Sequence, residues 1–441
     1  MSSEQPHGSS PRTLAADLIN HVDEQVTLRG WLHTRRDLGG VAFIVLRDRS
    51  GHAQCIVEGD ALREALAHLQ VESVLALTGT VAADARARGG AELRVAQVEV
   101  LSPVLEPPPF EINRAELKPS IDILLDHAAV ALRHQSRAAT GRLLSGLVAA
   151  WREALRARSF VEIFTPKLVG SATEGGANVF EVRYFERQAY LAQSPQLYKQ
   201  MLVGVHERVF EIGPVFRAEP HATSRHLNEY ISLDLEFGFI DNHRDVMALV
   251  EVVLRDVMAQ LQETNAAELE LLNVRMPNFD TFPILTFVEA LELIYREFGE
   301  DARHEDDLSP QHERWLGEWA LREHNADAIF VEGFPMSKRP FYTMPDPEQP
   351  ETSRSFDLLF RGLELITGGQ RQHRHDDLTA ELRKRWMRPQ PFEGYLEAFQ
   401  YGMPPEGGCA FGLERFVAQL IGAANIRDVR PFPRDINRLL P

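Results

Sequence analysis

Two arginines and a glutamate near the middle of the chain have the spacing of a phosphate-binding hairpin. Arg217 and Glu219 stand two residues apart in VFRAEPHATSRHLNEYISLDLEF, so on a strand both side chains point to the same face. The loop that follows carries Arg225 between His221 and His226. Guanidinium groups pair with phosphate oxygens through two parallel hydrogen bonds, which suits a polyphosphate. An ion-paired surface hairpin has the same spacing, and these residues alone leave both interpretations open.

A pair of acidic residues further along predicts a metal ion beside the phosphates. Asp357 and Glu364 lie in SFDLLFRGLELITGGQRQHR, and a tight turn at Phe360–Arg361 would set them directly opposite each other in a hairpin. Such carboxylates bind Mg²⁺ next to a nucleotide, where the substrate phosphates complete the coordination. The alternative is a hairpin held by salt bridges to Arg354 and Arg361.

A glycine-rich strand that runs into a helix completes the set. In GGCAFGLERFVAQLIG, residues 407–422, Arg415 falls in the first helical turn, and the glycines leave room for a flat ligand over the backbone. Gly368 and Gly369 likewise allow close approach beside Arg371. One such junction is weak support for a site, but three such elements in one domain indicate nucleotide binding.

The elements that must position these residues read as an α+β fold in two domains. Residues 14–104 hold five short strands and one helical patch near 61–70, which is the pattern of a small Greek-key barrel of the oligonucleotide-binding (OB) type. A polar tail, 1–13, is expected to be disordered, and the proline-rich segment 105–135 to be a hinge or linker. Residues 136–441 mix strands and helices without a regular βαβ order, which favours an antiparallel sheet flanked by helices.

Periodicity within the second domain predicts three supporting features. A helix opens the domain with a buried face, and residues 230–240 alternate as a strand with one polar face. Residues 241–350 are helix-rich, and we expect them to be scaffold without chemistry. The helix face consists of Leu143, Leu147, Trp151 and Leu155, and the strand places Ile231, Leu233, Leu235, Phe237 and Phe239 opposite Ser232, Asp234 and Glu236.

Composition excludes several classes of protein. The chain has 441 residues and a net charge of −17, which argues against a protein that coats nucleic acid through bulk attraction. A local positive segment runs from Arg29 to Arg49. The two cysteines, Cys55 and Cys409, offer neither a disulfide framework nor a thiolate zinc site. No apolar run is long enough to span a bilayer, and the N-terminus lacks an apolar signal region, so we expect a cytoplasmic protein.

Together these segments resemble the signature motifs of class II aminoacyl-tRNA synthetases, and in particular the archaeal-type aspartyl-tRNA synthetases. The helix and strand ending at Pro166 resemble motif 1, which forms the dimer interface in that family and implies a homodimer. FRAE with its loop resembles motif 2, and GLER at 412–415 resembles motif 3. More specific likenesses are ATEGGANVF at 172–180, AQSPQLYKQ at 192–200 and GGQRQHR at 369–375.

The resemblance implies roles for individual residues. Arg217, Glu219 and Arg415 would be catalytic, with Arg217 on the α-phosphate, Glu219 on the adenine and Arg415 on the outer phosphates. The implied ATP site comprises Arg217, Ala218, Glu219, Arg225, His226, Leu227, Glu364, Gly412, Leu413, Glu414 and Arg415. The implied aspartate site comprises Glu174, Gln196, Lys199, Arg217, Asp234, Thr367 and Arg371. The implied Mg²⁺ ligands are Asp357, Glu364 and Thr367. Thr367 stands where the family usually has serine, and Ala410 where it usually has glycine.

The barrel is implied to hold the anticodon of the tRNA. Phe43 resembles the aromatic residue on which an anticodon base stacks, although a core position in the strand VAFIVL is the alternative. The implied contacts are His33, Arg36, Phe43, Gln54, Arg88 and Glu92. Histidine at position 33 resembles enzymes that charge tRNA(Asn) as well as tRNA(Asp) and pass the product to an amidotransferase, whereas Arg88 matches neither marker residue of that region.

The resemblance thus implies ATP-dependent ligation of L-aspartate to tRNA through an aspartyl-adenylate, with tRNA(Asp) and tRNA(Asn) as acceptors. Three alternatives stay open: an enzyme strictly specific for tRNA(Asp), an asparaginyl-tRNA synthetase, and an amide synthetase built on the same catalytic domain. The last is disfavoured because such paralogues generally lose the barrel.

Overall fold

The computed structural model describes residues 12–170, 178–220 and 223–440. They belong to two compact units that divide between Ser120 and Ile121. No helix within these ranges is both long enough and apolar enough to cross a membrane.

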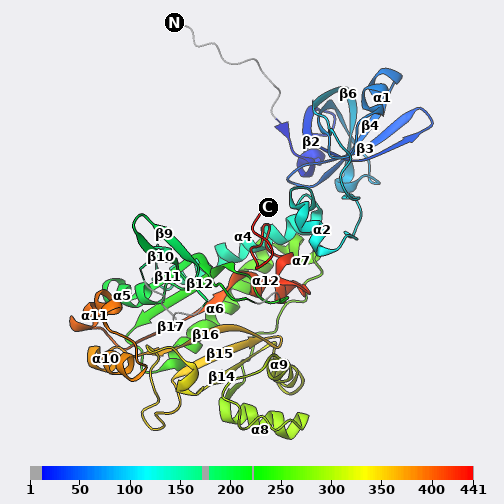
Figure 1. The fold of residues 1–441 in the computed structure, drawn as a ribbon. Helices are drawn as coiled ribbons and strands as arrows, with labels where there is room; N and C mark the ends of the chain where they lie inside the picture. Colours follow the sequence, from blue (N-terminus) through cyan, green and yellow to red (C-terminus); the bar gives the residue numbers. More distant parts are fainter. Residues whose placement is uncertain (1–11, 171–177, 221–222, 441) are drawn as a thin grey trace. The chain divides into compact units, whose positions relative to one another are not determined.

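The first unit is a closed barrel, as the sequence predicted (Figure 1). Its strands follow the order β1-β2-β3-β4-β6-β5, and β5 pairs back with β2. Alternate residues such as Leu28, Ile44, Cys55 and Leu93 fill the interior because successive side chains on a strand point to opposite faces. The elements are β1 Arg12–Thr13, β2 Gln25–Leu38, β3 Val41–Arg47, β4 His52–Glu58, α1 Asp60–Ala67, β5 Val74–Ala83 and β6 Ala91–Ser102, with 3₁₀ turns at Ala15–His21 and Arg88–Gly90.

The boundaries of the units differ from the sequence expectation at two places. Arg12 and Thr13, assigned to the tail, form β1 alongside β2, while residues 1–11 lie outside the described residues. The helices α2 (Ile121–Asp126) and α3 (Ala128–Ala131) belong to the second unit, although residues 105–135 were expected to be linker. The proline run predicted an extended segment, but it did not show that the second unit begins at Ile121.

The second unit is built on an eight-stranded sheet that is antiparallel except at its two edges, which confirms the α+β class. The strands in spatial order are β13 Ile284–Thr286, β14 Ala328–Glu332, β15 Ser355–Phe360, β16 Leu363–Arg371, β17 Glu406–Gly412, β12 Glu229–Gly238, β11 Arg208–Phe216 and β7 Val161–Glu162. A separate small sheet contains β8 Leu168–Val169, β10 Arg187–Leu191 and β9 Glu181–Tyr184.

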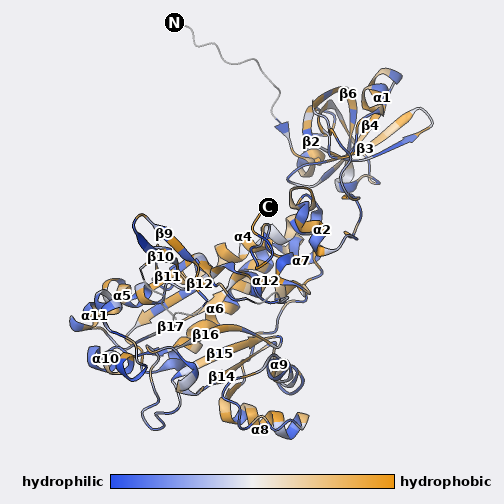
Figure 2. Ribbon diagram, in the orientation of Figure 1, coloured by the Kyte–Doolittle hydropathy of each residue, from blue (hydrophilic) through white to orange (hydrophobic). Residues whose placement is uncertain are grey.

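Helices cover one face of the large sheet with apolar side chains (Figure 2). The predicted face of α4 is confirmed, because Leu143, Leu147, Trp151 and Leu155 are all buried there. A capping box formed by Asn242 and Asp245 starts α6. The other face of the sheet stays polar and holds the site. The helices are α4 Gln135–Arg156, α5 Gln196–His206, α6 His243–Thr264, α7 Ala266–Leu271, α8 Phe287–Phe298, α9 Pro310–His324, α10 His375–Lys384, α11 Glu393–Gln400 and α12 Leu413–Ile421.

Two local predictions about these strands are wrong. The alternating strand ends at Gly238, and Phe239 adopts a φ of 61° with its side chain in solvent, so it leaves the apolar face. The turn between β15 and β16 lies at Arg361 and Gly362, both with positive φ as a two-residue hairpin turn requires. Together with a bulge after Leu358, this turn pairs Asp357 with Thr367 instead of Glu364.

Candidate active site

A cavity of about 480 Å³ opens on the polar face of the large sheet. Strands β12, β16 and β17 form its floor, α5 and α12 contribute from either end, and the segment after β11 forms one wall. Most of the residues singled out in the sequence line it: Gln196, Arg217, Glu219, Arg225, His226, Leu227, Glu364, Thr367, Arg371, Gly412, Glu414 and Arg415. Segments far apart in the sequence therefore meet at one site. Glu174 lies outside the described residues.

The closed end of the cavity holds two buried cations between carboxylates. Lys199 Nζ donates to Asp234 Oδ1 at 3.1 Å and lies 3.2 Å from Glu236 Oε2, while Arg371 Nε donates to Glu236 Oε1 at 2.7 Å. Burial alone would lower the pKa of Lys199, but Asp234 and Glu236 raise it, so the amine stays charged. Arg371 reaches the cavity, whereas Lys199 and Asp234 lie directly behind its wall and bind each other.

Glu236 and Glu406 are components of this end for which the sequence predicted no role. Glu406 is fully buried and accepts a hydrogen bond at 3.0 Å from Gln200 Nε2, whose own Oε1 accepts one from the Tyr395 hydroxyl. Burial, and then the charge of Glu236, raise the pKa of Glu406 well above its usual value. The signal for Glu236 was its place on the polar face of the alternating strand. No sequence signal identified Glu406.

Close approach of the backbone at this end requires glycine. A Cβ atom on Gly408 would lie 2.1 Å from the carbonyl oxygen of Leu235 and 2.3 Å from Glu236 Oε2. The glycine-rich stretch of β17 therefore lets the strand pack against the carboxylate that holds both cations.

The open end of the cavity presents arginines that already have acidic partners. Arg225 Nη1 donates to Glu313 Oε2 at 3.3 Å, and Arg415 Nη1 donates to the backbone oxygen of Glu364 at 3.0 Å while lying 3.5 Å from its carboxylate. Arg217 lies over the ring of Tyr230, with its Cζ 5.8 Å from the ring centroid. All three guanidinium groups are partly exposed. A guanidinium group has five N–H donors, so Arg225 and Arg415 can bind phosphate oxygens and keep these carboxylate contacts.

Three of the residues implied for ATP binding, Leu413, Glu414 and Ala218, also make contacts within the protein. Leu413 is buried in the hydrophobic core at the start of α12. The Glu414 carboxylate accepts from the amide of Ile231 and from Arg430, and burial raises its pKa. The amide of Ala218 donates to the carbonyl of Asn178 at 2.8 Å. These contacts fix the backbone on both sides of the cavity.

The implied metal ligands fit a hard cation. Thr367 Oγ1 donates to Glu364 Oε1 at 3.3 Å, and Asp357 lies behind them, where its Oδ2 accepts from Arg339 at 3.0 Å. Burial, with Glu364 nearby, raises the pKa of Asp357 to about 6. Its Oδ1 is buried and has no hydrogen-bond partner among the described residues. One or two carboxylates with substrate phosphates are the usual environment of Mg²⁺, and these residues supply that number.

Residues 241–350 are more than scaffold, because some of them reach the cavity. Glu313 on α9 binds both Arg225 and the amide of Glu364, and Arg339 binds Asp357. Burial, and then the nearby Glu364, raise the pKa of Glu313. The helical pattern identified the packed face of α9. It did not predict that the tertiary structure would bring Glu313, a polar residue of this helix, to the edge of the cavity.

The residues implied for the anticodon share one outer face of the barrel in the first unit. Phe43 on β3 is partly exposed and lies outside the hydrophobic core, which excludes the core alternative. It pairs in register with Arg36 and Ile56, and beside it Gln54 Nε2 donates to Glu92 Oε2 at 3.0 Å. The face therefore offers an aromatic ring beside a hydrogen-bonded amide and carboxylate.

His52 joins the two residues that the sequence connected with tRNA choice. Its ring centroid lies 4.5 Å from that of His33, and its Nδ1 lies 3.4 Å from Arg88 Nη1. Burial, and then the neighbouring His33 and Arg88, lower the pKa of His52 to about 4. It is therefore neutral at pH 7. His52 was not predicted, because nothing in the pattern of β4 separates it from other outward-facing residues.

Comparison with known proteins agrees with this geometry. The family model of class II tRNA synthetases (D, K and N) matches residues 120–436, and that of the OB-fold nucleic acid binding domain matches residues 26–101. The chain therefore belongs to the class II tRNA synthetases, and it is an aminoacyl-tRNA synthetase with an OB-fold domain. The resemblance drawn from the sequence is confirmed.

The individual relatives cover nearly the whole chain. An aspartate–tRNA(Asp/Asn) ligase of Thermus thermophilus is 48% identical over 98% of this chain and 100% of its own length. One of Deinococcus radiodurans is 44% identical, over 98% and 99%. The structure of an asparaginyl-tRNA synthetase from Pyrococcus horikoshii complexed with asparaginyl-adenylate has a TM-score of 0.89 and 33% identity, covering 96% of this chain and 97% of that one.

Proposed function

We propose that this enzyme activates L-aspartate with ATP and transfers it to tRNA(Asp) and tRNA(Asn). The observation that carries the choice of amino acid is the buried cation pair at the closed end of the cavity. The names of the Thermus and Deinococcus relatives, which include both tRNAs, support the choice of acceptors.

Charge explains the preference for aspartate over asparagine. The two amino acids have nearly the same shape, so the pocket must sense the side-chain carboxylate. Arg371 faces the cavity, and Lys199 lies behind it bound to Asp234. An incoming carboxylate gives these cations a partner, and the substrate ammonium then takes Asp234. The side-chain amide of asparagine carries no charge, so it cannot form an ion pair with Lys199 or Arg371.

In the first step an oxygen of the substrate α-carboxylate attacks the α-phosphorus of ATP, and pyrophosphate leaves. Arg217 is placed to neutralise charge on the α-phosphate, and Arg225 and Arg415 to hold the outer phosphates. Asp357, Glu364 and Thr367 would hold Mg²⁺, which when bound neutralises charge on the phosphates. No protein nucleophile is required. In the second step a ribose hydroxyl at the tRNA end displaces AMP.

We propose that the enzyme works as a homodimer. Apolar side chains gather around the edge strand β7 and its neighbours, with Phe164 84% exposed, Phe239 73% and Val205 67%. The segments are adjacent, since the amide of Gly238 donates to the carbonyl of Glu207 and that of Ile163 to the carbonyl of Phe210. A second copy would cover this surface. We also propose that Asp-tRNA(Asn) passes to an amidotransferase, because that product must be amidated before use.

Two assays test the proposal. Pyrophosphate exchange into ATP should depend on aspartate and not on asparagine, and a preference for asparagine would select the asparaginyl alternative. Charging of purified tRNA(Asp) and tRNA(Asn) side by side shows which of the two tRNAs the enzyme accepts. An enzyme that charges only tRNA(Asp) would be the strictly specific alternative.

A further inference from the structure

A second, smaller cavity of about 230 Å³ adjoins the active site on the far side of its phosphate-binding arginines. Arg225 and Arg415 line both cavities, and so does Ile426. The remaining cationic lining comes from Arg314 on α9 and Arg361 in the β15–β16 turn. The two cavities are thus neighbours that share two guanidinium groups.

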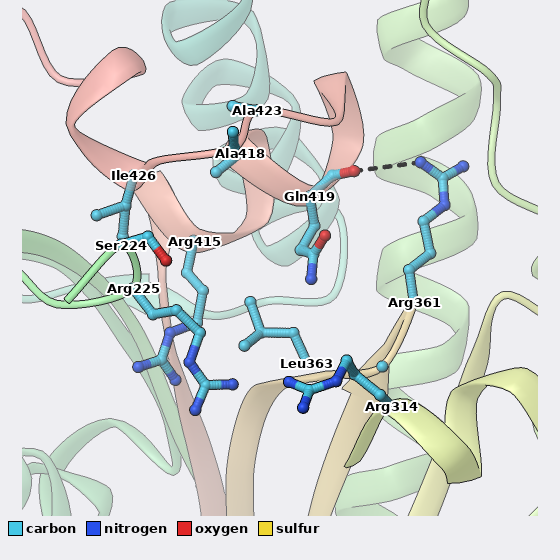
Figure 3. Close-up of a pocket in the computed structure, with 12 residues that line it drawn as sticks. Ser224, Arg225, Arg314, Arg361, Leu363, Arg415, Ala418, Gln419, Ala423 and Ile426 are labelled. Atoms are coloured by element: carbon cyan, nitrogen blue, oxygen red, sulfur yellow. Dashed lines mark hydrogen bonds between the residues drawn. The ribbon is translucent and has the colours of Figure 1, made fainter. Parts of the chain in front are cut away.

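The lining of this cavity is cationic, although the chain is acidic. Among the residues that the structure describes, the lining contains four arginines and no aspartate or glutamate, in a chain with a net charge of −17. The apolar part of the lining includes the buried side chains of Leu363 and Ile426, while Arg314 is exposed to solvent (Figure 3). Clustered cations at a low-dielectric wall favour a polyanion and give nothing to a neutral ligand.

The four arginines are not equivalent. Arg361 is held away, since its Nε donates to Asp327 Oδ1 at 3.0 Å and its Nη1 to the carbonyl of Gln419 at 3.2 Å (Figure 3). Arg225, Arg314 and Arg415 instead turn their guanidinium groups toward the same space (Figure 3). Arg314 donates to the neutral amide oxygen of Gln311, and no ion pair of Arg314 occurs among the described residues.

The carboxylates nearby are already matched to the other cations. Glu313 accepts from Arg225, Glu364 lies 3.5 Å from Arg415, and Asp327 accepts from Arg361. Arg314 therefore supplies the positive charge that none of these carboxylates balances. Arg314 lines the smaller cavity but not the active-site cavity.

We propose that this cavity is the release site for inorganic pyrophosphate, with Arg314 as the residue that draws it out of the active site. The inference rests on the proposed function. Adenylate formation makes a bond from the substrate carboxylate oxygen to the α-phosphorus, and it breaks the bond from that phosphorus to the oxygen that bridges to the β-phosphorus. The bonding electrons leave with pyrophosphate, which becomes a separate polyanion held by Arg225 and Arg415. Those two groups can turn the product into the second cavity, where Arg314 receives it.

This arrangement separates the exit of pyrophosphate from the entry of the tRNA end. The main cavity must stay occupied by the adenylate while the tRNA end enters it. A side exit lets pyrophosphate leave without passing the entering tRNA, and it keeps the reverse reaction from competing with transfer. The same chemistry would accept the outer phosphates of a second nucleotide, and the experiment separates that source from free pyrophosphate.

The test is Arg314→Ala in the full-length enzyme, with Arg322→Ala on the same helix as the matched control. Arg322 pairs with Glu297 and Glu323 and does not line the cavity. In aspartate-dependent exchange we expect the KM for pyrophosphate to rise about 5- to 20-fold in Arg314→Ala, while the KM for ATP changes less than 2-fold. Arg322→Ala should match the wild type, and Arg314→Lys should recover part of the loss.

Three results would overturn the inference. Equal rises in the KM for ATP and for pyrophosphate would make Arg314 part of the ATP site. Weaker inhibition by excess ATP with an unchanged KM for pyrophosphate would make the cavity a second-nucleotide site. Calorimetric binding of inorganic pyrophosphate alone, without aspartate, should weaken in Arg314→Ala, and equal binding would again exclude a release site. This last measurement stands even if aspartate is not the substrate, so failure of the proposed function is recognised separately.

Discussion

The charge cluster at the closed end of the active-site cavity and the residues around Phe43 on the outer face of the barrel differ in burial. Lys199, Asp234, Glu236 and Arg371 are each at most 7% exposed and compensate one another. On the barrel, Phe43 and Gln54 are instead partly exposed and Arg36 is exposed, while Glu92 is the buried member of this face. In the buried cluster we therefore expect each charge to affect both activity and stability, whereas at Phe43 we expect the two effects to be separable.

The largest effect on stability should follow from breaking the buried ion pair between Arg371 and Glu236. Arg371→Met leaves Glu236 with one cation in a dry environment, and we expect a loss of about 3–5 kcal/mol in the free energy of unfolding together with loss of aspartate activation. Urea unfolding and pyrophosphate exchange measure the two effects. Arg374→Met, at an exposed cation just beyond the same strand, should change stability by no more than about 0.5 kcal/mol. Equal stability of the two variants would show that burial is not what distinguishes this site.

Arg217→Ala should separate activity from stability within the active site. Arg217 is partly exposed, so its removal leaves no buried charge without a partner. We expect the exchange rate to fall about 10²- to 10³-fold, as for other groups that stabilise charge in a transition state, with a melting temperature close to wild type. Retained exchange would remove Arg217 from the reaction.

On the barrel, Phe43→Ala and Ile44→Ala form a matched pair on one strand. Loss of a stacked base costs about 1–3 kcal/mol, so Phe43→Ala should raise the KM for tRNA roughly 5- to 150-fold and leave exchange and stability unchanged. Ile44 is fully buried, and its truncation should cost about 2–5 kcal/mol of stability. If Phe43→Ala destabilised the barrel to the same degree, the separation of function and stability there would be refuted.

The smallest effect concerns pH. Because the pKa of His52 is lowered from 6.5 to about 4, the unfolded chain binds a proton between these values that the folded barrel does not bind. Stability should therefore fall as the pH drops from 6.5 toward 4, by about 1 kcal/mol once the partial exposure of the ring is taken into account. His52→Gln should reduce that dependence in urea unfolding at pH 7 and pH 5. An NMR titration midpoint near 6.5 would show that burial does not lower the pKa of this ring.

Much of the site was predictable because its signals are local. Arg217 and Glu219 share a face by strand periodicity, and Arg415 follows a glycine-rich strand, so short segments indicated their chemistry. Glu313, Arg339 and Glu406 were not predictable in this way, since each reaches the site through packing between distant segments. The pairing of Asp357 with Thr367 also escaped prediction, because a bulge shifts the strand register without a distinct sequence signal.

The two folds, the family and most of the arginines and carboxylates that line the cavity could be inferred from the sequence, because periodicity and short motifs are properties of neighbouring residues. The tertiary structure alone decided which charges neutralise each other. Lys199 binds Asp234, burial raises the pKa of Glu406, and Arg314 has no acidic partner within the described part of the chain. These facts depend on burial and on distances between segments far apart in the sequence.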